Sequence, residues 1–227
     1  MFVYSYFCYN KNMEKIKKYI SIDAPAEVFN HIQQLGYDTI SIRPTEQVNS
    51  PVSSHPDIQM CRMGCHDKDE LILAQSNELG SVYPDDIPFN AACTGKYFIH
   101  NLKYTNPRLL ARARELEMNF IDVKQGYTKC SMVIVDEDSI ITYDDGISSA
   151  CQAQGMNVLS IQPGFVKLNG YNTGFIGGTS GRVGNTIMFS GDISKHPDGE
   201  QIIDFIKNRG LNVEWLDFPL TDIGSII

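Results

Sequence analysis

The chain has 227 residues, of which 42% are hydrophobic and 20% charged, and its formal net charge is −8 at pH 7. This is ordinary globular usage, with enough apolar side chains for a sizeable core, so the composition argues against a disordered chain. The negative charge disfavours nonspecific binding to nucleic acid or to an anionic membrane surface, and it mildly favours cationic ligands.

The N-terminal segment carries no sign of export. No apolar run approaches the length that spans a bilayer, and residues 1–12 lack the basic start and the small-residue cleavage site of a signal peptide. Residues 13–18 resemble a more natural start, so we expect 1–12 to be an appendage and 13–227 to form a single domain. The six cysteines are too few for a disulfide scaffold. We therefore expect a cytoplasmic protein with reduced thiols.

The first quarter of the chain predicts a short α/β segment and then a hairpin. Strands are expected at 18–23 and 39–42, with a helix between them that Asp23 caps and Gly36 ends. A strand from Asp57 to Met63 then pairs with 70–74 in the predicted hairpin.

Three longer segments follow, and each predicts the order strand, strand, helix, strand. The first comprises 86–93, 96–100, 106–117 and 120–123; the second comprises 131–135, 139–143, 145–154 and 157–161. The third begins in a glycine-rich turn at 174 and continues with 185–189, 198–208 and 211–216. Residues 222–227 predict one more opening strand, with no unit after it.

A short phrase recurs where these segments open, at 56–61, 85–90, 127–132, 173–178 and 221–226. From Asp86 onward the spacing is roughly 40 to 50 residues, which is typical of propellers, solenoids and arrays. A unit of this length cannot bury its own apolar face, so the units must stack. The sequence therefore predicts an α/β fold: a five-bladed, pseudo-symmetric propeller of ββαβ units. The C-terminal strand would complete the first blade and close the ring.

Over about residues 18–227 this ring resembles the pentein superfamily of guanidino-group-modifying enzymes, and it is most similar to an uncharacterised group of bacterial pentein-like proteins. The resemblance implies a Cys nucleophile, a His and carboxylates that hold the guanidinium, with no cofactor. His55-Pro56-Asp57 resembles the His-x-Asp element of these enzymes. The family usually places its Cys near the C-terminus, whereas 219–225 contain none. The superfamily also includes a non-catalytic ribosome anti-association factor.

Three aspartates, Asp57, Asp86 and Asp222, occupy equivalent places at predicted blade openings. A closed ring would bring them together, and grouped carboxylates raise one another's pKa unless a cation neutralises them. A guanidinium would do so with bidentate hydrogen bonds. The alternative is that each aspartate caps a turn. Asn90 and Arg182 complete the predicted substrate-binding set, with Arg182 as a partner for a substrate carboxylate.

Cys130 is the candidate nucleophile because it opens the fourth predicted blade and because Lys129 beside it can lower its pKa. The alternative is a small buried apolar residue, and a one-residue slip of strand register leaves the choice open. His55 lies in a polar loop and is the candidate general acid and base, with a solvated surface histidine as the alternative. A second His-Pro-Asp, at 196–198, shows that this tripeptide is not specific.

Two further patterns carry weaker signals. Cys61, Cys65 and His66 suggest a metal site with His55 or Asp67 as a fourth ligand, but structural zinc prefers paired spacing, so no metal is predicted. The glycine-rich run at 174–185 lacks the Gly-Lys-Ser/Thr ending of a phosphate loop. Close backbone approach in a tight hairpin is the favoured interpretation. Backbone amides that line a cavity floor, or an oxyanion pocket, are the functional alternatives.

These observations predict a hydrolase or amidinotransferase for a small guanidino or amidino compound. Cys130 would attack the guanidino carbon, His55 would shuttle the proton, and the three aspartates would hold the cation. The alternative is a non-catalytic pentein-fold protein that binds a cationic metabolite or a macromolecular partner, which the missing C-terminal Cys favours. No cofactor, metal, nucleic acid or membrane partner is expected, and the oligomeric state stays open, a homodimer included.

Overall fold

The computed structural model describes residues 15–49 and 51–227, so the predicted appendage at 1–12 lies outside the described residues. The fold is mixed α/β, with five small sheets and five α-helices in this part of the chain. The predicted α/β class is therefore confirmed. None of these helices is long and apolar enough to cross a lipid bilayer.

The two N-terminal sheets have two strands each. The first pairs β1 (Lys17–Ser21) in parallel with β2 (Asp38–Ile42), and α1 (Ala26–Gln34) connects them. The second is an antiparallel hairpin of β3 (Met60–Arg62) and β4 (Leu71–Leu73), preceded by the short helix α2 (Pro56–Gln59).

Three three-stranded sheets follow, each with one helix. The first contains β5 (Ala92–Cys93), β6 (Tyr97–His100) and β7 (Asn119–Asp122), with helix α3 (Pro107–Glu115). The second contains β8 (Met132–Asp136), β9 (Ser139–Thr142) and β10 (Asn157–Ser160), with helix α4 (Asp145–Ala153). The third contains β11 (Ser180–Val183), β12 (Thr186–Phe189) and β13 (Asn212–Trp215), with helix α5 (Gly199–Lys207). In each sheet the first two strands are antiparallel and the last two parallel, because a helix makes the parallel crossover. The predicted order strand, strand, helix, strand is confirmed for these units.

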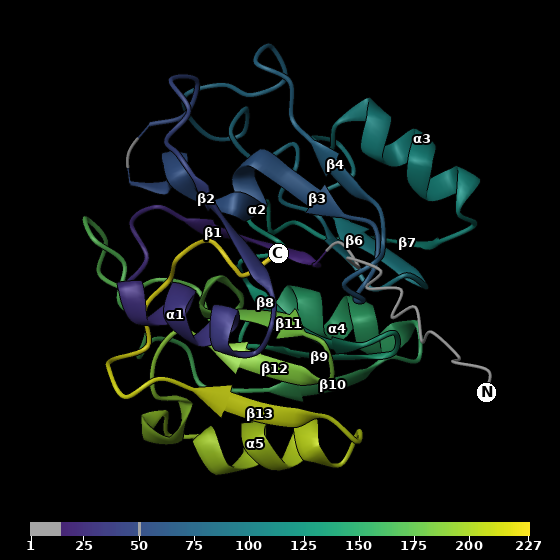
Figure 1. Ribbon diagram of the computed structural model, residues 1–227. Coiled ribbons are helices and arrows are strands. Elements are labelled where there is room, and N and C mark those ends of the chain that lie inside the picture. Colours follow the sequence, from purple (N-terminus) through teal and green to yellow (C-terminus); the bar gives the residue numbers. More distant parts are fainter. Residues whose placement is uncertain (1–14, 50) are drawn as a thin grey trace, which may run out of the picture.

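The C-terminal segment lies between the first and last sheets. The backbone N–H of Tyr19 donates to the Ile227 carbonyl at 2.7 Å, and the N–H of Ile226 donates to Ser180 O at 3.0 Å (Figure 1). The predicted strand at 222–227 is not formed, because Gly224 and Ser225 adopt φ values of 69° and 71°, which interrupt extended backbone. The segment nevertheless makes backbone contacts with both neighbours.

Two predicted opening strands are wrong over part of their length. Pro56 starts a helical turn, so Asp57 lies in α2 and the strand begins only at Met60. Of 86–93, only β5 is a strand, because the preceding residues form turns in which Asn90 N–H donates to Ile87 O at 2.9 Å. Asp23 does not cap α1 either: Pro25 is the N-cap, and Asp23 Oδ2 accepts from Ser54 Oγ at 2.6 Å.

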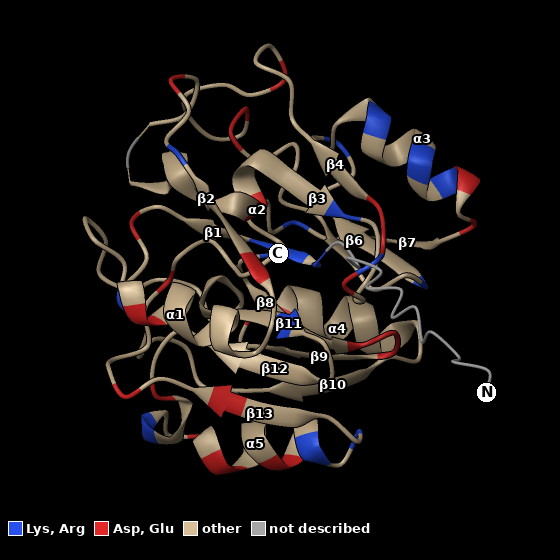
Figure 2. Ribbon diagram, in the orientation of Figure 1, with Lys and Arg blue, Asp and Glu red and all other residues tan. Residues whose placement is uncertain are grey.

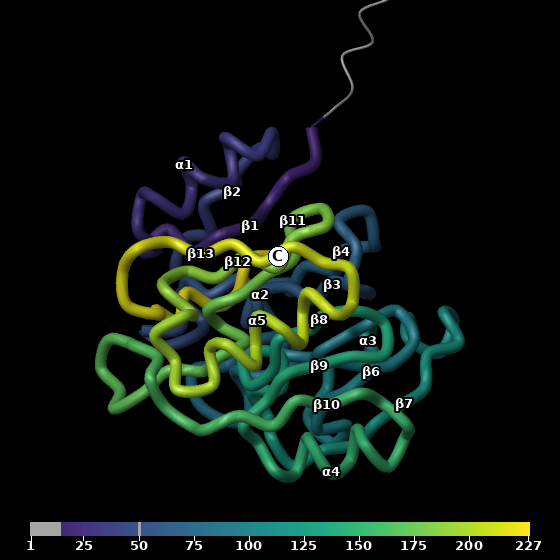
Figure 3. The backbone as a smooth tube through the Cα atoms, turned by 90° about the horizontal axis from the view of Figure 1, so that it is seen from below, coloured from purple at the N-terminus to yellow at the C-terminus, as the bar shows by residue number. Residues whose placement is uncertain are grey.

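The four longer helices, α1, α3, α4 and α5, cover apolar clusters, whereas the short helix α2 is buried. Helix α3 carries arginines at several positions, and α1 and α4 lie at opposite edges of the molecule (Figures 2 and 3). In α5, Ile202 and Ile206 are fully buried against β12 and β13 residues, as its apolar spacing predicts. This packing leaves the first strands of the sheets, and the turns before them, in the interior. The candidate site is built there.

Candidate active site

Asp57 is the centre of a buried polar cluster. Its Oδ2 accepts hydrogen bonds from Ser225 Oγ at 2.6 Å and from Cys130 Sγ at 3.1 Å. Lys129 Nζ donates to the same Ser225 Oγ at 2.9 Å. The helical turn of α2 places the carboxylate, and Asp57 N–H anchors the turn by donating to Gly224 O at 3.1 Å. Residues from three segments that are far apart in the sequence thus meet around one carboxylate.

Asn90 fixes the turn that carries the thiol. Its Nδ2 donates to Asp57 O at 3.0 Å and to Cys130 Sγ at 3.1 Å. Its Oδ1 accepts from the backbone N–H groups of Lys129 at 2.9 Å and Cys130 at 3.2 Å. The amide is thereby occupied by this protein's own atoms. The structure places Asn90, predicted as a substrate ligand, where it positions Cys130.

Burial dominates the electrostatics of the thiol. It raises the pKa of Cys130 well above its usual value, and the negative charges of Asp57 and Asp222 raise it further. Burial likewise lowers the pKa of Lys129, against the opposing charge of Asp57. The prediction that Lys129 gives Cys130 a low pKa is therefore wrong for the resting protein. Cys130 is a protonated thiol at neutral pH, and its proton points to Asp57.

Asp222 and His55 lie beside this cluster. Asp222 Oδ2 accepts from Phe175 N–H at 2.9 Å, and burial raises its pKa, with the charge of Asp57 adding to the rise and His55 opposing it. His55 Nδ1 is 3.8 Å from Asp222 Oδ1. His55 is only 4% exposed, so the surface alternative is wrong. The histidine faces the carboxylate pair from the N-terminal end of α2.

Asp86 does not join the other two aspartates. Its Oδ2 accepts from Tyr127 Oη at 2.5 Å, and burial raises its pKa. Its electrostatic neighbours are Tyr127 and Asp85, whereas those of Asp222 include Asp57. Of the three carboxylates that were predicted to meet, Asp57 and Asp222 lie close together and Asp86 does not.

An aromatic group lies next to the carboxylates, and the sequence did not single it out. The ring of Phe175 is 5.8 Å from that of Tyr127 and 6.3 Å from that of Tyr143, between centroids. Burial raises the pKa of both tyrosines, and the charge of Cys130 contributes to each rise, which places the rings near the thiol. Tyr127 and Phe175 lie in two of the recurring phrases, at 127–132 and 173–178, which was the available signal; Tyr143 follows β9 and had none.

The glycine-rich run serves close backbone approach, as the favoured interpretation predicted. A Cβ on Gly177 would collide with the carbonyl oxygens of Lys129, Cys130 and Met132. A Cβ on Gly178 would collide with the Asp222 carboxylate. Only glycine therefore allows this turn to pass behind Cys130.

Arg182 lies apart from Cys130. Its Nε donates to Gly184 O at 3.0 Å and its Nη1 to Val135 O at 3.4 Å, so backbone carbonyls hold the guanidinium. Together with Lys18 it lines a cavity among residues of β1, β3 and β11. The structure does not bring Arg182 to the predicted substrate-binding carboxylates.

The predicted metal candidates do not meet as a set. Cys61 Sγ lies 3.6 Å from Cys93 Sγ in the core, whereas ligand atoms of Cys65, His66 and Glu137 lie within 4.8 Å of one another. His66 Nε2 already pairs with Glu137 Oε1 at 2.6 Å. Burial raises the pKa of the Cys65 thiol to about 12. This second group differs from the predicted set, which combined Cys61, Cys65 and His66 with His55 or Asp67.

Lys18 predicts a pH dependence of stability. It is 2% exposed and paired with Asp67 Oδ1 at 2.5 Å, and burial lowers its pKa from 10.5 to about 8. Between these values Lys18 binds more protons in the unfolded chain than in the folded one, so its own contribution to the free energy of unfolding rises with pH. We expect this contribution to rise by about 2 kcal/mol between about pH 8 and 9.5, from 1.36 kcal/mol for each pKa unit.

Urea denaturation of the wild type and of Lys18→Met at several pH values in this window measures the difference in slope. The comparison is needed because buried Lys129 contributes a slope of the same sign. The buried thiols of Cys65, Cys130 and Cys151 act in the opposite direction above about pH 8.5, because burial raises their pKa values, and the buried tyrosines do so above about pH 10. Equal slopes in the two proteins would contradict the assignment to Lys18.

Comparison with solved structures identifies the fold as the pentein fold. A dimethylarginine dimethylaminohydrolase, solved as an adduct with S-methyl-L-thiocitrulline, is 12% identical, with a TM-score of 0.53 over 89% of this chain and 92% of that chain. An amidinotransferase of the saxitoxin biosynthetic pathway from Microseira wollei is 10% identical, with a TM-score of 0.53 over 90% of this chain and 89% of that chain. At this identity the similarity establishes the fold alone.

The chain belongs to a family of unknown function, DUF6873, whose sequence model matches residues 19–227. No curated protein sequence matches it significantly. The expected kinship with an uncharacterised pentein-like group therefore agrees with the family assignment, and the chemistry has to be argued from the site itself.

Proposed function

We propose that the protein is a hydrolase or amidinotransferase that acts on a small guanidino or amidino compound through Cys130. One observation carries the proposal: on a pentein fold, a buried thiol lies 3.1 Å from both the Asp57 carboxylate and the Asn90 amide. The proteins of similar fold bear the names of a dimethylarginine hydrolase and an amidinotransferase, which supports a guanidino substrate.

The architecture we propose is one domain over 13–227, in which the five sheets are blades of a ring. The hydrogen bonds of the C-terminal segment to Tyr19 and Ser180 support a first blade completed by the end of the chain. In such a ring the turns that carry His55, Cys130 and Asp222 converge on the axis. This explains how residues far apart in sequence come to share one buried cluster.

The carboxylates would recognise the cation. Asp57 and Asp222 are buried close enough to raise the pKa of Asp222, so a guanidinium between them would relieve their repulsion. The faces of Tyr127, Tyr143 and Phe175 add favourable contacts for a planar cation. The same positive charge would lower the pKa of Cys130, so the thiol would be activated only when substrate is bound.

The proposed reaction begins when Cys130 transfers its proton to Asp57 Oδ2 and its sulfur bonds to the guanidino carbon. The bond from that carbon to the leaving amine breaks, and His55 donates the proton that the amine needs. Water, or an acceptor amine in the transferase case, then attacks the carbon and gives up one proton to His55. The carbon–sulfur bond breaks, the Cys130 thiolate takes back its proton from Asp57, and the product loses its remaining excess proton to solvent, which restores the starting state.

The test is a search for a covalent adduct. The full chain is incubated with arginine, agmatine and S-methyl-L-thiocitrulline, and intact-mass and peptide mass spectrometry follow. The expected result is an adduct on the peptide that contains Cys130, absent from Cys130→Ala, together with release of the leaving group, which is ammonia or an amine for arginine and agmatine and methanethiol for S-methyl-L-thiocitrulline. Turnover that Cys130→Ala retains in full would show that the nucleophile is assigned wrongly.

A non-catalytic binding protein is the second candidate, and one observation favours it. The Lys129 ammonium is already held next to the Asp57 carboxylate through Ser225, so a cation built into the protein partly neutralises the acidic pair. If guanidino compounds raise the unfolding temperature but yield neither adduct nor product, this second function replaces the first.

The charge of Asp57 makes a separate prediction about thiol reactivity. Because this charge helps to raise the pKa of Cys130, Asp57→Asn is expected to increase the rate of iodoacetamide labelling of Cys130 about threefold or more at pH 8. Cys151 is the internal control, since burial alone raises its pKa to about 12. An equal increase at both thiols would indicate general loosening of the fold instead.

A further inference from the structure

Lys18 and Arg182 line a cavity that also reaches Lys129, the residue next to Cys130. Its volume is about 60 Å³, and its lining comes from β3, β11 and the C-terminal segment, among other elements. This is the room of a few water molecules, or of the oxygens of one small anion. Figure 2 shows basic segments of β1, β3 and β11 around the C-terminal end in the middle of the view.

The lining is strongly basic. Four cationic side chains line the cavity, namely Lys18, Arg62, Lys129 and Arg182, against the single carboxylate of Asp67. The protein as a whole carries a net charge of −8, so this concentration of positive charge runs against its overall balance. Nearby acids outside the lining include Asp69, which interacts with Arg62, and Glu137, which is hydrogen-bonded to His66 at 2.6 Å.

Most of this positive charge has no carboxylate partner. Lys18 pairs with Asp67 at 2.5 Å, whereas Arg62 Nη1 donates to the carbonyl oxygens of Asp67 and Asp69 at 3.0 and 2.8 Å. Carbonyl oxygens also hold Arg182. Among the described residues, Arg62, Arg182 and Lys129 form no ion pair within 4.0 Å, and Nη2 of neither arginine makes a hydrogen bond.

Neutral carbonyls fix the positions of the guanidiniums, whose charge is offset only by carboxylates outside ion-pair distance: Asp67 and Asp69 for Arg62, and Glu137 for Arg182. Partly buried cations without counter-charge are unfavourable, and an anion in the cavity would offset that cost. A guanidinium presents paired N–H donors that match the two oxygens of a carboxylate or phosphate group. A metal ion is excluded on the same ground, because four cations would repel it.

We propose that this cavity binds a small oxyanion, a carboxylate or a phosphate group, held by Arg62, Arg182 and the ammonium groups of Lys18 and Lys129. The site is separate from the proposed reaction at Cys130 and does not depend on it. Lys129 is the one residue common to both, since its ammonium lines the cavity and also donates to Ser225.

The test measures binding of inorganic phosphate and of succinate to the full chain by isothermal titration calorimetry, with ionic strength held constant by chloride. Saturable 1:1 binding of at least one anion is expected. Binding of phosphate alone identifies a phosphate group as the ligand chemistry, and binding of succinate alone identifies a carboxylate. Absence of saturable binding by both anions would overturn the proposal.

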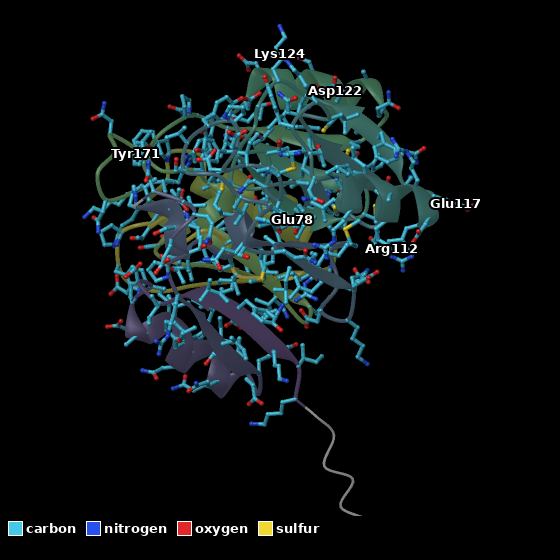
Figure 4. All side chains as sticks on the ribbon, turned by 90° about the horizontal axis from the view of Figure 1, so that it is seen from above. Glu78, Arg112, Glu117, Asp122, Lys124 and Tyr171 are labelled. Carbon is cyan, nitrogen blue, oxygen red and sulfur yellow. The ribbon has the colours of Figure 1, made fainter. Side chains whose placement is uncertain are left out.

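Variants locate the site. Arg182→Gln should weaken binding tenfold or more, whereas Arg112→Gln should leave it unchanged, because Arg112 lies at the periphery on α3 and pairs with Glu70 at 2.6 Å (Figure 4). A thermal melt checks that each variant folds. If Arg182→Gln does not, Arg62→Gln replaces it, with the same expected loss. Equal weakening by Arg112→Gln would show general charge screening and would also overturn the proposal.

Discussion

Cys130→Ala is expected to lower turnover of a guanidino substrate by about 1,000-fold or more, because removal of a covalent nucleophile leaves only binding and orientation. The variant should still fold. The side chain removed is small, and the hydrogen bonds to Asp57 and Asn90 that it gives up are worth about 1–2 kcal/mol together. The measurement is steady-state turnover of the compound that forms the adduct, together with urea denaturation.

The matched control for this variant is Cys61→Ala. Cys61 is also buried, but its Sγ lies against Cys93 and Ala91 O in the core, away from the carboxylates. This change should cost a comparable amount of stability and leave turnover within about twofold, since packing defects act locally. Retention of a tenth of wild-type turnover by Cys130→Ala would rule out the proposed covalent step.

The elements that the sequence predicted well are those whose signal is local. The three ββαβ units have amphipathic helices and short apolar strands between turn residues, and both patterns survive in the structure. The prediction failed at 57–63 and 86–93, where tertiary contacts decide the backbone. Asp57 N–H bonds Gly224 O from the far end of the chain, and such a contact leaves no trace in a local pattern.

The same distinction applies to the site. Cys130 and Asp57 could be nominated because recurrence of one phrase marks equivalent places, and equivalent places meet in a pseudo-symmetric fold. The recurring phrase does not indicate the direction in which each side chain points. Asp86 therefore turned to Tyr127 instead of Asp57, and Ser225, which bonds both Asp57 and Lys129, was not nominated at all. Ser225 lies in a turn near the C-terminus, where Gly224 and Ser225 both adopt a positive φ.

Gly177→Ala is expected to destabilise the fold by more than about 3 kcal/mol, because overpacking against backbone cannot be relieved by a rotamer change. The added Cβ would meet three carbonyl oxygens from the turn that carries Cys130. That turn accepts a hydrogen bond from Gly178 N–H at 3.1 Å, so any relief must move the thiol as well. Urea denaturation gives the stability, and labelling of Cys130 reports its displacement.

Gly146→Ala in α4 provides the comparison, because it makes the same substitution where the nearest atom to the new Cβ is a side-chain oxygen of Asp144 at 3.1 Å. Alanine is a better helix former than glycine by about 1 kcal/mol, so this variant should change stability by less than about 1 kcal/mol in either direction. If the two variants lose equal amounts of stability, the backbone of the turn behind Cys130 can move to make room for a Cβ on Gly177. The thiol would then not be held in a fixed position by the backbone, and the rigid placement on which the proposed attack depends would fail with it.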